Sequence, residues 1–213
     1  GVHSPEAAVE VARAIAAAQG LRFEGLLTYP PVGGAAAVES FFGAAMASLA
    51  AVGLDCPVRS NGGSPDFFSA HLVPSATEHR AGTYVYNDRS MVRAGHCGRE
   101  DLAMHVLATV VSRPTPDRAV IDAGSKALTS DLLGFADHGE IEGLPGARIV
   151  SLSEEHGVVD LAACEGRRPE VGEMVRIVPN HTCVVSNLFD RMVFHRGGTV
   201  TRVEAVAARG TVW

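Results

Sequence analysis

The residues best suited to chemistry lie in the segment PNHTC, residues 179–183. If this segment is extended, positions two apart face the same way, and His181 and Cys183 then point to one side. An imidazole and a thiolate together favour Zn²⁺, and two protein ligands leave coordination positions for water and a substrate. The alternative is a buried cysteine beside a polar histidine, which is the commoner arrangement for an isolated pair of this kind.

A second candidate site lies in NGGSP, residues 61–65, between a predicted strand and a predicted helix. The backbone N–H groups of glycines and the start of a helix attract anions, and Ser64 adds a hydroxyl donor. The segment RAGT, residues 80–83, leads into the next predicted strand and would complete the same anion site. Taken one at a time, an ordinary turn capped by Ser64 and a surface arginine at position 80 are the simpler interpretations.

Three further side chains are candidates for polar roles. Tyr29 follows a predicted strand, where a phenol can contact a ring, although a turn or core tyrosine fits equally well. The turn EEHG, residues 154–157, places acids beside His156, which is our candidate acid–base group, with a polar turn as the alternative. Lys126 is the only lysine and so the only amine for a Schiff base, but no apolar pocket is predicted around it.

The elements that position these residues change character along the chain, and the predicted fold class is α/β plus β. Residues 1–97 alternate strand and helix, which indicates parallel strands with helical crossovers. Their few strands form either a small open α/β domain or part of a barrel. Residues 98–213 contain short strands separated by Gly, Pro and Asn, which predict an antiparallel β domain. We also expect a strand over 83–86, a strand over 102–111 and a short helix over 129–135.

Composition excludes several classes of protein. The chain has 213 residues, of which 46% are hydrophobic and 20% charged, so it is not a disordered chain. Its net charge of −6 and the lack of a basic run argue against nucleic acid and anionic membranes as partners. No apolar stretch reaches the roughly 18 residues of a membrane span, and no signal peptide is evident. Four separated cysteines without a CxxC motif favour a reducing, cytoplasmic location.

Six motifs in order carry a resemblance to one family. They are GLLTYPP (25–31), SNGGSP (60–65), EHRAGTYVYND (78–88), IDAGSKALTSD (121–131), LSEEHG (152–157) and VPNHTCVVSNLFD (178–190). Together they resemble the D-threonine aldolase and D-serine dehydratase family of pyridoxal-phosphate enzymes, which have the alanine-racemase type of fold. That fold is a (β/α)₈ barrel followed by a β domain. The resemblance therefore implies the C-terminal part of the barrel over residues 1–97 and the β domain, with the metal site, over 98–213.

The resemblance also implies roles for particular residues. Tyr29 would meet the pyridine ring of pyridoxal 5'-phosphate, and the phosphate pocket would be formed by Gly63, Ser64, Arg80, Gly82 and Thr83. His181 and Cys183 match the metal pair of D-serine dehydratase, which binds zinc. Several D-threonine aldolases have aspartate at the second position and prefer manganese or similar ions, so the thiol of Cys183 tilts the expected metal toward zinc. The implied reaction is aldol cleavage or dehydration of a β-hydroxy D-amino acid.

One departure from the family is large. The family's Schiff-base lysine lies near the N-terminus, on the first barrel strand, and Lys126 does not match that position. We therefore expect the chain to be the C-terminal portion of an enzyme whose first half lies elsewhere, and to be inactive alone. A homodimer and a small D-amino-acid substrate are further expectations from the resemblance. The alternative is a non-catalytic fragment or zinc-binding module.

Overall fold

The computed structural model describes residues 1–211, and the chain divides into two compact units between Tyr84 and Val85. This division precedes the expected domain boundary at residue 97, because Asp88 is hydrogen-bonded to Thr182 within the second unit. The final residues of the expected β domain, 212–213, lie outside the described part of the chain. Among the described residues, no helix has the length and apolar character that crossing a membrane requires.

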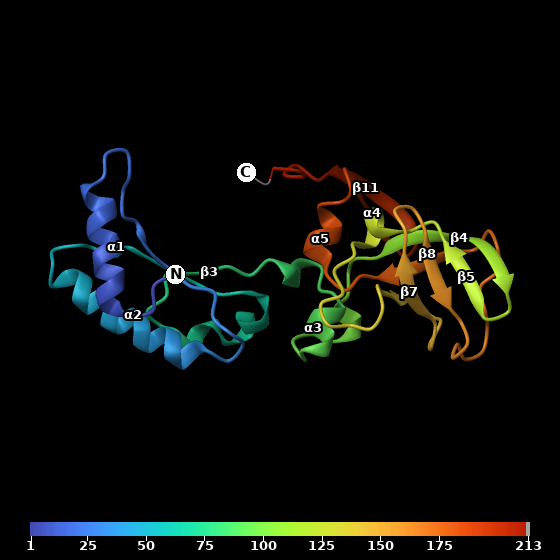
Figure 1. Cartoon of the computed structure of the whole chain (residues 1–213), viewed down its shortest axis with the longest axis horizontal. Coiled ribbons are helices and arrows are strands. Elements are labelled where there is room, and N and C mark those ends of the chain that lie inside the picture. The colour runs from blue at the N-terminus through green and yellow to red at the C-terminus, as the bar shows by residue number, and fades with distance from the viewer. Residues whose placement is uncertain (212–213) are drawn as a thin grey trace. The chain divides into compact units, whose positions relative to one another are not determined.

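The first unit alternates helices and short parallel strands (Figure 1). Its three-stranded sheet has the order β1-β2-β3, with both neighbouring pairs parallel. Ser4 caps the first helix by accepting a hydrogen bond from the N–H of Ala7, as a serine before Pro5 favours. The elements are α1 (Pro5–Ala17), β1 (Gly25–Leu27), α2 (Ala35–Ala50), β2 (Val58–Asn61), the 3₁₀ helix η1 (Ser64–Leu72), β3 (Glu78–His79) and the 3₁₀ turn η2 (Thr83–Val85), which ends at the first residue of the second unit.

The strand that we expected over residues 83–86 is wrong. Residues Thr83–Val85 form η2, and the third strand is instead the two-residue β3 just before it. The cause is Ser64, whose hydroxyl oxygen accepts hydrogen bonds from the N–H groups of Gly82 and Tyr84. Those two N–H groups therefore bond to a side chain and not to a neighbouring strand.

The second unit is built on a six-stranded antiparallel sheet with the order β6-β9-β4-β5-β8-β7, which confirms the expected α/β plus β fold class. A separate two-stranded hairpin joins β10 to β11. The large sheet buries one continuous apolar cluster that includes Ile121, Ile149, Leu161 and Ile177. The elements are α3 (Arg89–Arg93), η3 (Arg99–Asp101), β4 (Val106–Thr115), β5 (Arg118–Ile121), α4 (Ser125–Leu128), β6 (Glu140–Ile141), β7 (Arg148–Leu152), β8 (Gly157–Asp160), β9 (Met174–Val178), α5 (Thr182–Ser186), β10 (Arg191–Arg196) and β11 (Thr199–Ala205).

Two predictions for this unit need correction. The helix expected over residues 129–135 is absent, because Thr129 and Leu133 have φ angles of 62° and 47°, outside the right-handed helical region. Local hydrogen bonds replace the helix, since the N–H of Leu133 bonds to the carboxylate of Asp131. Strand β4 also begins and ends later than the expected 102–111, and it continues through Pro114 to the hairpin with β5.

Candidate functional site

The glycine turn of the first unit follows directly on β2. Gly62 has a φ of 119°, and a Cβ atom at this residue would lie 2.6 Å from the ring of His79. A Cβ atom at Gly63 would lie 2.9 Å from the ring of Tyr29. The turn therefore lies between two aromatic rings, and glycine is required at the first position by both conformation and space. Both glycines are buried, and the carbonyl oxygen of Gly63 lies 2.9 Å from Nε2 of His79.

Ser64 connects this turn to the segment before η2. Its side chain is buried, and its Oγ accepts hydrogen bonds from the N–H of Gly82 at 3.1 Å and the N–H of Tyr84 at 3.3 Å. A hydroxyl oxygen has two lone pairs and one hydrogen, so accepting both bonds leaves the hydrogen to be donated elsewhere. The arrangement suits an anion oxygen at the start of the nine-residue η1.

The other predicted pocket residues are brought partly together. Arg80 donates one hydrogen bond to the Ser60 hydroxyl and another, of 2.9 Å, to the carbonyl oxygen of Thr28, so its guanidinium joins the ends of β1 and β2. Tyr29 lies beside Gly63 and is 72% exposed. Thr83 begins η2, immediately after Gly82. The carboxyl ends of the parallel strands thus gather the residues that the motifs singled out.

His181 and Cys183 lie at the start of a short helix in the second unit. His181 is extended and caps α5, which starts at Thr182, so the expectation of an extended segment through residue 183 is wrong. The side chains still meet: a hydrogen bond with Cys183 raises the pKa of His181, and burial opposes the rise. The carboxylate of Asp131 lies 3.9 Å from Nδ1 of His181. Cys183 is exposed, which leaves the thiol accessible.

The donor atoms of this pair suit zinc, but they do not form a complete protein cage. Within residues 1–211, no group of three or more His, Cys, Asp or Glu side chains is placed to hold a metal ion. A borderline-soft nitrogen and a soft sulfur are nevertheless the ligand types that Zn²⁺ selects. A metal held by His181 and Cys183 would take its remaining ligands from water, substrate or other groups.

His156 lies in the turn between β7 and β8, and Lys126 lies in α4. His156 is exposed, and its carbonyl oxygen accepts a hydrogen bond from the N–H of Ser153, which closes the turn. Its acid–base role stays a prediction. Lys126 pairs with Glu155 at 2.6 Å, and this hydrogen bond raises the pKa of Lys126. A Schiff-base amine needs the opposite shift, so Lys126 does not have the environment of such a residue.

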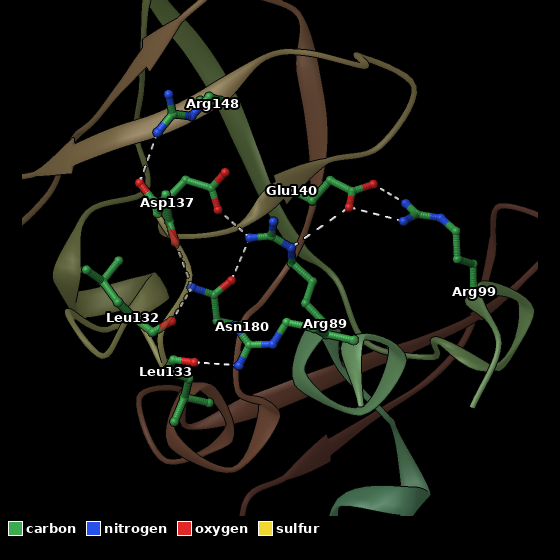
Figure 2. Close-up of polar contacts among 10 residues, drawn as sticks. Arg89, Arg99, Leu132, Leu133, Asp137, Glu140, Arg148 and Asn180 are labelled. Atoms are coloured by element: carbon green, nitrogen blue, oxygen red, sulfur yellow. Dashed lines mark hydrogen bonds and ion pairs between the residues drawn. The ribbon is translucent and has the colours of Figure 1, made fainter. Parts of the chain in front are cut away.

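Sequence reasoning missed a polar network around Arg89 and Asn180, the residue that precedes His181 (Figure 2). Asn180 is fully buried and donates to the carbonyl oxygen of Asp137 at 2.8 Å, while its own side-chain oxygen accepts from Arg89 at 2.7 Å. Arg89 also bonds to the Asp137 carboxylate at 2.5 Å. The local signals were Asn180, which stands beside His181 in the segment PNHTC, and Asp88, a good helix cap directly before Arg89.

Comparisons with known proteins show which family the chain resembles. The family model described as a putative serine dehydratase domain matches residues 103–195. The chain is 33% identical over 183 residues to D-threo-3-hydroxyaspartate dehydratase of Delftia sp. (strain HT23), covering 78% of this chain and 45% of the relative. It is 34% identical over 168 residues to D-threonine aldolase of Arthrobacter sp., covering 74% and 41%. The chain thus spans about half the length of the curated relatives that it matches.

Solved structures give the same result. The crystal structure of D-threonine aldolase from Filomicrobium marinum superposes with a TM-score of 0.84 at 30% identity, covering 100% of this chain and 61% of that one. A cysteine-to-alanine variant of the D-threo-3-hydroxyaspartate dehydratase, described as the metal-free form, has a TM-score of 0.71 at 30% identity, covering 88% and 57%. The chain therefore belongs to the family of D-threonine aldolases and D-serine dehydratases.

Proposed function

We propose that this chain supplies the metal pair and the cofactor-phosphate loop of a lyase that acts on β-hydroxy D-amino acids. The observation that carries the proposal is the position of His181 and Cys183 at the start of α5, where Nδ1 of His181 is buried and has no hydrogen-bond partner among the described residues. Two structures of the D-threo-3-hydroxyaspartate dehydratase supply support, because the histidine and the cysteine replaced by alanine in them are also two positions apart. The relatives' names include both an aldolase and dehydratases, so either cleavage or elimination fits.

The first unit fits the phosphate group of pyridoxal 5'-phosphate. The Ser64 hydroxyl has a hydrogen to donate, and Ser64 begins η1 directly after the glycine turn. Tyr29 lies beside Gly63, and the N–H of Gly82 bonds to the Ser64 hydroxyl. We propose that Arg80, Gly82 and Thr83 form the adjoining part of the pocket. When bound, the cofactor makes the bonds at the amino acid's Cα labile. The chain's own task is to hold the phosphate and orient the ring.

The second unit fits a divalent metal at His181 and Cys183, with zinc favoured by the thiol and manganese as the alternative. The metal would supply Lewis acidity at the substrate's β-hydroxyl group. The two residues would orient that hydroxyl both in aldol cleavage, which breaks the Cα–Cβ bond, and in dehydration, which removes hydroxide. We keep His156 as the proposed acid–base group and propose that the Schiff-base lysine belongs to a barrel half outside this chain.

Metal analysis of the purified chain tests this proposal. We expect about one zinc per chain in the wild type, and much weaker binding in His181→Ala and Cys183→Ala. Binding of pyridoxal 5'-phosphate, followed by absorbance, should weaken in Ser64→Ala by about ten- to a hundredfold, as for a hydrogen bond to a charged group. Unchanged zinc content in both metal-pair variants would contradict the metal centre.

Turnover tests the remaining expectations. The chain alone, given cofactor and zinc, should not convert D-threonine to glycine and acetaldehyde or D-serine to pyruvate and ammonia. Turnover by the chain alone would contradict the proposal that the Schiff-base lysine lies elsewhere. Zinc binding that persists without cofactor binding would favour the zinc-module alternative. Light scattering of the purified chain checks the proposed homodimer.

A further inference from the structure

Asp88 is a carboxylate buried completely inside the second unit. Its Oδ1 accepts hydrogen bonds from the Ser90 hydroxyl at 2.6 Å and the N–H of Met91 at 3.1 Å, which caps α3. Its Oδ2 accepts from the N–H of Thr182 at 3.0 Å and from the Thr182 hydroxyl at 3.3 Å. One side chain therefore joins the start of α3 to the first residue of α5, although the two lie far apart in the sequence.

Arg89, the next residue, contacts the two residues of the same segment that precede His181. Its N–H donates to the carbonyl oxygen of Pro179 at 3.2 Å, and its guanidinium binds Asn180 and Asp137, as Figure 2 shows. Asn180 is buried and its side-chain nitrogen is bonded as well, to the carbonyl oxygen of Asp137. The backbone leading to α5 is therefore fixed by two adjacent side chains.

The contacts of residues 179–183 follow a pattern. Asn180 and Thr182 are buried and bonded to Arg89 and Asp88 respectively. His181, which lies between them, is half-buried, and Cys183, which follows Thr182, is exposed. The side chains of His181 and Cys183 interact with each other. Anchoring alternate residues leaves the imidazole and the thiol on the outer side, next to one another.

We propose that Asp88 and Arg89 are positioning residues that hold His181 and Cys183 in place for the metal, an inference that rests on the proposed function. Precise metal sites need a supporting shell that fixes the ligands before the ion arrives. A fully buried carboxylate is costly unless it is hydrogen-bonded, and this one accepts four bonds.

The test measures Zn²⁺ affinity by chelator competition on the full chain, and the unfolding of each metal-free variant. Asp88→Asn keeps the size of the side chain and should weaken zinc binding about ten- to a hundredfold, as expected for the outer shell of a metal site. Thr182→Val keeps the backbone bond and should weaken it less. The matched control is Glu39→Gln, which alters another carboxylate that accepts both the N–H and the hydroxyl of one distant serine, Ser75.

The result separates three possibilities. Weaker zinc binding by folded Asp88→Asn, with unchanged affinity in Glu39→Gln, supports the proposal. Unchanged affinity in both Asp88→Asn and Thr182→Val would overturn it, provided that His181→Ala and Cys183→Ala still lose zinc. Zinc binding that does not depend on His181 and Cys183 would overturn the metal centre itself. If Asp88→Asn does not fold, weaker binding by Thr182→Val supports the proposal and unchanged binding overturns it.

Discussion

The two units of the chain bury their apolar residues in different ways. The second unit encloses one continuous cluster across six antiparallel strands, including Ile121, Ile149 and Ile177. The first unit has three short parallel strands, and the apolar cluster next to them contains only Val38, Phe42 and Val73 among its buried members. Antiparallel strands joined by hairpins can close a core on one face, whereas parallel strands depend on layers covering both faces.

The difference also separates the two kinds of chemistry. The parallel strands of the first unit end together, so the glycine turn after β2 and the segment after β3 lie at one edge, where Ser64 joins them. The second unit holds His181 and Cys183 on a short helix after β9, anchored by side-chain hydrogen bonds. The order of the parallel strands brings the two loops of the first candidate site together. Hydrogen bonds to buried polar side chains hold the two candidate metal ligands of the second.

The core of the second unit gives the largest expected effect on stability. Ile177 is fully buried in β9, so Ile177→Ala should lower the free energy of unfolding by about 2–5 kcal/mol. Hydrogen exchange should rise in residues 106–178 while residues 1–84 keep their protection. The control is Leu107→Ala on the neighbouring strand, where the side chain is exposed. Equal losses in the two variants, measured by urea unfolding, would contradict the described core.

The glycine turn after β2 in the first unit gives the next largest effect. A methyl group at Gly63 would lie 2.9 Å from the ring of Tyr29, so that ring must move in Gly63→Ala. We expect weaker binding of pyridoxal 5'-phosphate by about 1–3 kcal/mol, or roughly 5- to 150-fold, measured by absorbance titration. Gly43→Ala is the control, because nothing lies near that position in α2. Equal affinities for the two variants would remove Gly63 from the pocket.

A smaller effect is a pH dependence confined to the second unit. Burial lowers the pKa of His105 and of His138 below the ordinary value. At these two histidines the unfolded chain therefore binds more protons near pH 6, and their contribution to stability should fall as the pH drops below about 6.5, whereas the raised pKa of His181 acts in the opposite direction. Thermal unfolding between pH 5 and 8 measures the slope. The double variant His105→Gln with His138→Gln should remove the loss of stability at low pH, while His3→Gln should leave the pH profile unchanged.

The smallest expected effect concerns Lys126. Its side chain forms an exposed ion pair with Glu155, and exposed pairs add little stability because water and salt screen them. Lys126→Ala should leave the unfolding midpoint and the zinc affinity unchanged. A large loss of cofactor binding in this variant would show that the only lysine of the chain has a role that its surroundings do not suggest.

Much of the fold is predictable because its causes are local. Ser4 and Pro5 start the first helix, and the glycine turn at residues 61–65 stands between a strand and a helix as expected. In two of the predictions that failed, a distant partner decided the structure. In the expected strand over 83–86 the N–H of Tyr84 bonds to Ser64, and α5 begins at Thr182, whose N–H bonds to Asp88.

The amino-acid sequence by itself determined the order of the elements, the change from parallel to antiparallel strands, and the residue types of both candidate sites. These properties follow from hydrophobic period, turn residues and donor chemistry, which act over a few residues. Only the tertiary structure decided that Ser64 joins two strand ends and that Asp88 and Arg89 hold the segment bearing His181 and Cys183. Burying a carboxylate requires partners that no local pattern specifies, and folding alone brings them to it.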